Sequence, residues 1–106
     1  MAIVILPDAQ DDLLALQEYM LDQWGEPAWV AAEEEIFAKL ADVDKGLLTG
    51  AVLDEFATVG IHDYRNVFTS HHKLIYRRIN LDTYLYIVAA HRQDFPTLLM
   101  KRVLKA

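Results

Sequence analysis

Apolar residues follow a helical period in the first half of the chain. Between Pro7 and Gly25 they recur every three or four positions, at Leu13, Leu16, Met20 and Trp24. This spacing is typical of the buried face of an amphipathic helix, and Gly25 marks its end. A second helix is predicted over residues 27–43, with an inner stripe at Ile36, Phe37, Leu40 and Val43. Because so few residues separate the two helices, we expect an antiparallel hairpin.

The second half of the chain is patterned as strands. Three runs rich in β-branched and aromatic residues follow one another: Tyr64–Thr69, His72–Ile79 and Thr83–His91. Polar turn residues separate them, which predicts an antiparallel meander. Ile3–Leu6 is a further strand candidate, and Thr97–Leu104 forms a terminal helical segment. Residues 45–60 have no clean period, and we interpret them as a connecting loop with one helical turn around Val52–Phe56.

The order of elements predicts the fold class. A strand, two helices, three strands and a helical tail give a β-α-α-β-β-β chain, in which the helix hairpin must bury its apolar stripe on one face of the sheet. We therefore expect a two-layer α+β fold that occupies residues 1–106 as a single domain. The other face of the sheet needs some cover or a partner.

Composition excludes several kinds of chemistry. The 106 residues contain no cysteine, so disulfides, thiol catalysis and cysteine-bound zinc are excluded. His71 and His72 are neighbours, and adjacent strand residues point to opposite faces. We interpret them as turn histidines in solvent, and we expect no metal and no cofactor.

The opening residues, MAIVIL, lack a basic leader, and no apolar run reaches the length of a membrane span. We expect a cytoplasmic protein without a membrane partner.

Charge divides the chain into two unlike halves. Residues 1–62 contain two bases and thirteen acids, whereas residues 63–106 contain eight bases and three acids. Such asymmetry favours a macromolecular partner for the basic half. An equally strong alternative is a solvated sheet face whose arginines pair with helix carboxylates.

Several short motifs, in this order and spacing, resemble the RelE/ParE toxins of bacterial type II toxin–antitoxin modules. They are Pro7-Asp8-Ala9, YMLDQWG at the end of the first helix, the arginine-bearing strand Tyr64–Thr69, HHKLIYRRI, and YIVAAHRQD with its His91-Arg92 ending. The resemblance covers nearly the whole chain and implies a helical hairpin on a small antiparallel sheet. RelE-like members are ribosome-dependent mRNA endoribonucleases, whereas ParE-like members, often called plasmid stabilisation proteins, bind and poison DNA gyrase.

The ribonuclease positions decide between these branches. Cleavage by 2′-hydroxyl attack needs a proton acceptor, donors for the phosphorane charge and an acid for the leaving oxygen. Arg65 fits the first basic position of the RelE-like pattern, and Arg92 fits the one after the last strand. Val67 and Thr69 stand where further basic residues would be, and residues 96–98 lack the expected aromatic side chain. We therefore interpret the chain as ParE-like, without catalytic residues of its own. The alternatives are a ribonuclease that uses Arg65, Lys73 and Arg92, and a non-toxic, antitoxin-binding relative.

The resemblance also implies partners. These are DNA gyrase, contacted through residues 95–106, and an antitoxin whose C-terminal portion wraps the toxin. The antitoxin would begin with a ribbon-helix-helix dimer, so that operator DNA is contacted only through it. We predict that the residues that bind antitoxin or gyrase are Trp29, Arg65, Lys73, Arg77, His91, Arg92, Lys101, Arg102 and Lys105.

The choice of Trp29 and the place of His91 in this set each follow from an expected position in the fold. Trp29 is preferred over Trp24 as an interface residue because Trp24 continues the buried helical stripe. His91 ends its strand, and Asp94 is expected to cap the final helix. Replacing Asp94 by alanine would then cost about 1 kcal/mol.

Overall fold

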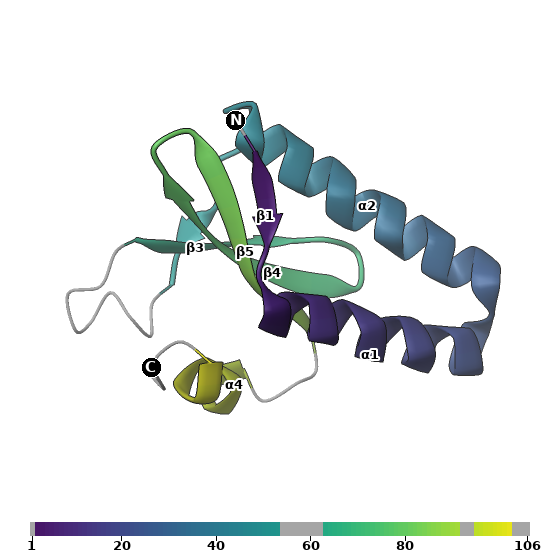
Figure 1. Cartoon of the computed structure of the whole chain (residues 1–106). Helices are drawn as coiled ribbons and strands as arrows, with labels where there is room; N and C mark the ends of the chain where they lie inside the picture. Colours follow the sequence, from purple (N-terminus) through teal and green to yellow (C-terminus); the bar gives the residue numbers. More distant parts are fainter. Residues whose placement is uncertain (1, 54–62, 92–94, 103–106) are drawn as a thin grey trace.

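The computed structural model describes residues 2–53, 63–91 and 95–102, and it confirms the α+β fold (Figure 1). The elements in chain order are β1 (Ile3–Ile5), α1 (Pro7–Trp24), α2 (Glu26–Asp44), β2 (Ala51–Val52), β3 (Tyr64–Phe68), β4 (His72–Ile79), β5 (Asp82–Ala90) and α4 (Phe95–Arg102). Both helices of the hairpin and all three meander strands lie within about two residues of their predicted bounds. No helix within the described ranges has the length and apolar character needed to cross a bilayer.

The sheet contains five strands in the order β1-β5-β4-β3-β2. The predicted meander is confirmed, since β3, β4 and β5 pair antiparallel. The sheet is nevertheless mixed, because β1 lies parallel to β5, with Ile3 opposite Thr83. The predicted helical turn is wrong at Val52, which pairs with Arg65 as part of β2. Pairing with the free edge of β3 satisfies the backbone there, whereas residues 54–56 of that prediction lie outside the described part of the chain.

One face of the sheet is covered by the helix hairpin. Ile36, Leu40 and Val43 of α2 are fully buried against Leu74 and Leu85 of the sheet. The predicted stripe was one residue too wide, because Phe37 is 38% exposed. Its position, one residue from Ile36, turns its side chain about 100° away from the sheet.

The opposite face is covered only in part. A smaller apolar cluster forms there around Ile75 and Ile87, and Leu98 of α4 packs against it. This helix is the predicted C-terminal tail. Phe68, at the end of β3, remains 55% exposed. The cover predicted for this face of the sheet is therefore present over only part of the face.

Candidate functional site

The predicted basic residues are distributed over both faces of the sheet. Arg65 pairs across strands with Tyr76, whose side chain is buried in the helix-facing core. Lys73 pairs with Phe68, and its Nζ lies 5.4 Å from the centre of the Phe68 ring, on the other face. Cross-strand neighbours point to the same face, and successive residues alternate. Arg65 and Lys73 therefore lie on opposite faces, and the structure does not bring them together in one site.

On the helix side, two arginines hold loops to the core. The Nη1 of Arg65 donates a hydrogen bond to the carbonyl of Gly50 at 3.0 Å. The two Nη atoms of Arg78 donate to the carbonyls of Val43, at 2.7 Å, and Leu81, at 3.0 Å. The Val43 carbonyl, in the last turn of α2, also accepts the backbone N–H of Gly46 at 3.0 Å, so Arg78 adds a second hydrogen bond to this helix end. A polar hollow of about 270 Å³ lies between these two side chains.

On the open face, Arg77 lies against a pair of tyrosine rings that contact each other edge-to-face, with 5.1 Å between their centres. Its guanidinium carbon is 5.1 Å from the Tyr64 ring centre and 5.9 Å from that of Tyr86. Its Nη1 also donates to the Tyr86 hydroxyl at 3.3 Å. Stacking and hydrogen bonding hold this arginine in one orientation. As predicted, it shares a face with Lys73, which leaves a cationic and aromatic surface beside α4.

The tail is tied to the first helix by an ion pair that the sequence pattern did not predict. Arg102 makes a two-pronged contact with the carboxylate of Asp12, in which Nη1 lies 3.1 Å from Oδ2 and Nη2 contacts Oδ1. The hydrogen bond to Asp12 raises the pKa of Arg102 above its usual value and outweighs the opposing effect of burial. Arg102 thus serves within the fold, while Lys101 beside it is exposed. The predicted site residues Arg92 and Lys105, and the predicted cap Asp94, lie outside the described residues.

The burial of the two tryptophans is the reverse of the prediction, in which Trp24 was buried and Trp29 was the interface residue. Trp29 is 5% exposed and packs with Met20 and Ala32 at the closed end of the hairpin. Trp24, the last residue of α1, is 60% exposed. The prediction failed because helix packing at the hairpin turn places the inner face of α2 against α1, and Trp29 lies on that inner face. Trp24 is therefore the tryptophan that a partner can reach.

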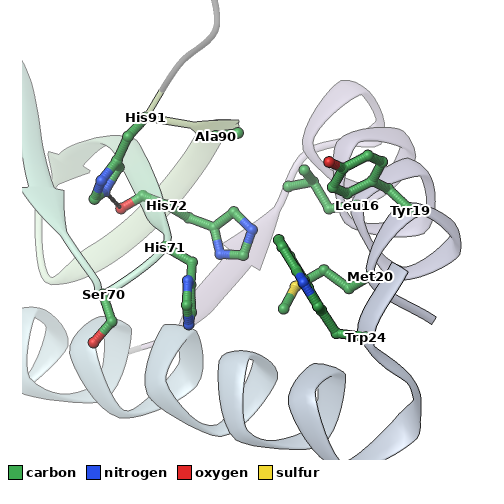
Figure 2. A pocket seen from close by; sticks show the side chains of 9 residues that line it. All are labelled: Leu16, Tyr19, Met20, Trp24, Ser70, His71, His72, Ala90 and His91. Atoms are coloured by element: carbon green, nitrogen blue, oxygen red, sulfur yellow. Dashed lines mark hydrogen bonds between the residues drawn. The ribbon is translucent and has the colours of Figure 1, made fainter. Parts of the chain in front are cut away.

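Beside Trp24, a pocket of about 240 Å³ opens between the end of α1 and the turn that joins β3 to β4 (Figure 2). Apolar side chains from α1 form one side, and the three histidines His71, His72 and His91 come from the sheet. The Nε2 of His91 lies 2.9 Å from the carbonyl of His72. Since a carbonyl only accepts, this nitrogen carries the hydrogen. Among the described residues, no group of histidines and carboxylates is arranged to hold a metal ion.

The prediction of solvent-exposed histidines is wrong for His72, which is 2% exposed. It shares a strand face with Leu74 and Tyr76, two residues and four residues further on, and both are in the core. Burial lowers the pKa of His72 to about 4, and the neighbouring His71 and His91 add to the effect. The alternation along β4 was the signal that could have placed this side chain correctly.

Comparisons with known proteins agree with this fold. Residues 3–95 match the model of a family described as the ParE toxin of the type II toxin–antitoxin system parDE. A solved chain of the chromosomal ParDE TA system from P. aeruginosa has a similar fold, with a TM-score of 0.67 at 12% sequence identity. The match covers 85% of this chain and 95% of that chain. No sequence among the curated proteins matches significantly. With almost its whole length matched by the family model, the chain belongs to the ParE toxin family of type II toxin–antitoxin systems.

Proposed function

We propose that this protein is a toxin that binds and inhibits DNA gyrase and is held inactive by a cognate antitoxin. Family membership is the observation that carries the toxin assignment. The toxin would act by stabilising a gyrase complex with cleaved DNA, and it would need no catalysis of its own. Its antitoxin would dimerise through a ribbon-helix-helix domain and contact operator DNA.

The distribution of basic groups favours gyrase binding over RNA cleavage. A ribonuclease must bring proton-transfer groups and charge-stabilising donors to one phosphate. Arg65 and Lys73 lie on opposite faces of the sheet, and Arg65 is engaged with the Gly50 carbonyl. Val67, at another position where the ribonuclease pattern has a base, is 6% exposed in the core. These positions cannot act together on one RNA backbone.

The partner surface that we propose lies on the open face of the sheet and along α4. It is defined by Phe68, Lys73, Arg77 and Lys101, in the half of the chain that carries eight bases against three acids. Cationic and aromatic groups that lie together are suited to an acidic protein surface. The same surface can bind gyrase or antitoxin, so that occupancy by one would exclude the other.

Expression in a bacterial host tests the proposal. Induction without antitoxin should produce filamentous cells and a DNA-damage response, and co-expression of the antitoxin should suppress both. Lys101→Glu should weaken the effect, because it reverses an exposed charge on α4. Lys45→Glu, which makes the same change at the exposed end of α2, serves as the matched control.

Two other outcomes would contradict the proposal in different ways. Rapid arrest of translation, with mRNA cut at ribosomal A sites, would assign the protein to the ribonuclease branch. A folded, abundant protein without any effect on growth would identify a non-toxic relative that only binds antitoxin.

A further inference from the structure

Arg77 differs from the other described arginines in what its guanidinium contacts. Its Nη1 donates to the hydroxyl of Tyr86 at 3.3 Å and lies 3.5 Å from that of Tyr64. No carbonyl or carboxylate of the described residues accepts a hydrogen bond from it. The other described arginines are bonded to such acceptors within the fold: Arg65 to Gly50, Arg78 to Val43 and Leu81, and Arg102 to Asp12.

The end of the Arg77 guanidinium is the part that a partner can reach. Its Nε is buried, and its Nη1 is bonded to tyrosine. Its Nη2 is not buried and has no hydrogen-bond partner among the described residues. This nitrogen carries two hydrogens, so it can donate to an acceptor that arrives from solvent.

The orientation of Arg77 is fixed before any partner binds. Its guanidinium contacts both tyrosine rings, and these rings pack against Ile75 and Ile87 in the apolar cluster of the open face. A side chain that is already ordered loses less conformational entropy on binding. Arginine is also among the residues that most often dominate interface energies. The rings displace water from the guanidinium, which strengthens its attraction to an opposite charge.

The charges on the same face of the sheet are positive. Lys73 lies four positions before Arg77 on β4, and across the strands Arg77 is flanked by Tyr64 and Tyr84. The helix beside this face, α4, ends in Lys101 and contains no acid. The described elements that surround Arg77 on this face therefore attract an anion.

The nearest acids along the strands are directed elsewhere. Asp63 precedes β3 and lines the polar hollow on the helix side, together with Arg65. Asp82 begins β5, and its Oδ1 accepts the backbone N–H of Ala2 at 2.8 Å. The acids of α1 and α2 belong to the hairpin on the other face of the sheet. In the described ranges, no carboxylate forms an ion pair with Arg77.

A carboxylate fits this position better than a phosphate of DNA. Affinity for DNA depends on the neutralisation of several phosphates by lysines and arginines. The described cations of the partner surface are only Lys73, Arg77 and Lys101, and the whole chain has a net charge of −6. One carboxylate needs a single charged donor, and a hydrogen bond between two charged groups is about twice as strong as a neutral one.

We propose that Arg77 is the anchor of the partner surface, and that its Nη2 donates to an aspartate or glutamate side chain of the antitoxin. The inference rests on the proposed function for the identity of the partner. It deepens that function by naming the toxin residue and the chemical group that it recognises. Tyr86 is a positioning residue, because it holds the guanidinium through Nη1.

Two synthetic peptides test the anchor without requiring the antitoxin. One has glutamates on both sides of a central leucine, and the other has glutamines in their place. Titration of isotope-labelled protein is followed by NMR through the Nε–H signal of Arg77, which is identified by its loss in Arg77→Lys. The glutamate peptide should shift this signal and bind about tenfold more tightly, which corresponds to 1.4 kcal/mol. Equal affinities would overturn the proposal. So would a short DNA duplex that shifts the signal at lower concentrations than the peptide, because the site would then bind phosphate.

Variants locate the effect at the guanidinium. Arg77→Lys keeps the charge but loses the planar group that contacts the rings, so the glutamate peptide should bind about tenfold more weakly. Arg65→Lys makes the same change on the opposite face and should leave binding unchanged. Tyr86→Phe keeps the ring and removes the hydrogen bond to Nη1. It should lower the preference for glutamate over glutamine about threefold while the glutamine peptide binds as before. Unchanged binding to Arg77→Lys would contradict the anchor.

The full antitoxin separates this proposal from the proposed function. Arg77→Ala should weaken its binding about thirtyfold, and replacing the matching antitoxin acid by glutamine should add little to that loss, as expected for residues in contact. If the antitoxin binds Arg77→Ala as tightly as the unmodified protein, the anchor is wrong while the toxin–antitoxin function stands. If it does not bind even the unmodified protein, the proposed function fails, and the peptide titrations still decide whether Arg77 binds carboxylates.

Discussion

Replacing Asp12 by alanine is expected to lower the free energy of unfolding by about 3 kcal/mol, because this carboxylate has two partly buried partners. Its Oδ2 accepts the backbone N–H of Val88 at 3.0 Å, on the edge of β5 beyond the last residue paired with β1. Its oxygens also pair with Arg102, and the two side chains are only 11% and 23% exposed. A buried donor left unpaired costs about 1–3 kcal/mol, and a hydrogen bond to a charged group contributes about 1.5–3 kcal/mol. Asp12 therefore joins three elements, α1, β5 and α4.

Urea denaturation measures this effect, and Asp11→Ala is the matched control. Asp11 is the exposed neighbour of Asp12, so its replacement should change stability by no more than about 0.5 kcal/mol. Arg102→Ala should cost less than Asp12→Ala, since the Val88 N–H keeps its acceptor. The double variant should be less destabilised than the sum of the single ones, as expected for residues in contact. Equal effects of Asp12→Ala and Asp11→Ala would contradict this role.

Acidification is expected to destabilise the protein through His72. Its pKa falls from 6.5 to about 4, chiefly through burial, with His71 and His91 adding and Glu35 opposing. Below pH 6.5 the unfolded chain binds a proton at this position that the folded chain does not bind. Stability is therefore lost as the pH falls from 6.5 towards 4, and no further loss arises from this group below that value. At 1.36 kcal/mol for each pH unit, the full loss is about 3 kcal/mol.

Unfolding free energies between pH 7 and pH 5 test this dependence, in a range where most carboxylates remain ionised. His72→Phe should remove most of the loss, because the replacement has no titrating group. His71→Phe changes the exposed neighbour and should retain most of it. If the unmodified protein and His72→Phe lose stability equally over this range, His72 is not a buried neutral histidine.

The hairpin and the meander could be predicted because their signals are local. Pro7 and Gly25 stand at the start and the end of α1, and the turn residues after β3 and β4 separate runs of clear strand character. The places of β1 and β2 were not predictable in this way. Both strands are only two or three residues long, and their pairing depends on free sheet edges that are distant in sequence. A period cannot be recognised in so few residues.

The candidate site was harder to predict because it depends on which face each side chain occupies. Arg65 and Lys73 both belong to the predicted set of basic site residues, but the strand register places them on opposite faces of the sheet. At the hairpin turn, where the two helices meet, Trp29 was predicted as the interface residue and Trp24 as a buried one. The structure shows the reverse, with Trp29 5% exposed and Trp24 60% exposed. In the sequence, Asp12 is only one of three acids near the start of the first helix, where negative charge is favourable. Its partners, Val88 and Arg102, are 76 and 90 residues away in the sequence.

The most direct test of the proposed activity uses purified protein, DNA gyrase, ATP and relaxed plasmid. We expect supercoiling to be inhibited and linear, gyrase-bound DNA to accumulate, and the antitoxin to reverse both effects. Lys101→Glu should be weaker than Lys45→Glu in the same assay. Unchanged supercoiling at saturating protein, together with cleavage of mRNA on purified translating ribosomes, would contradict the gyrase assignment.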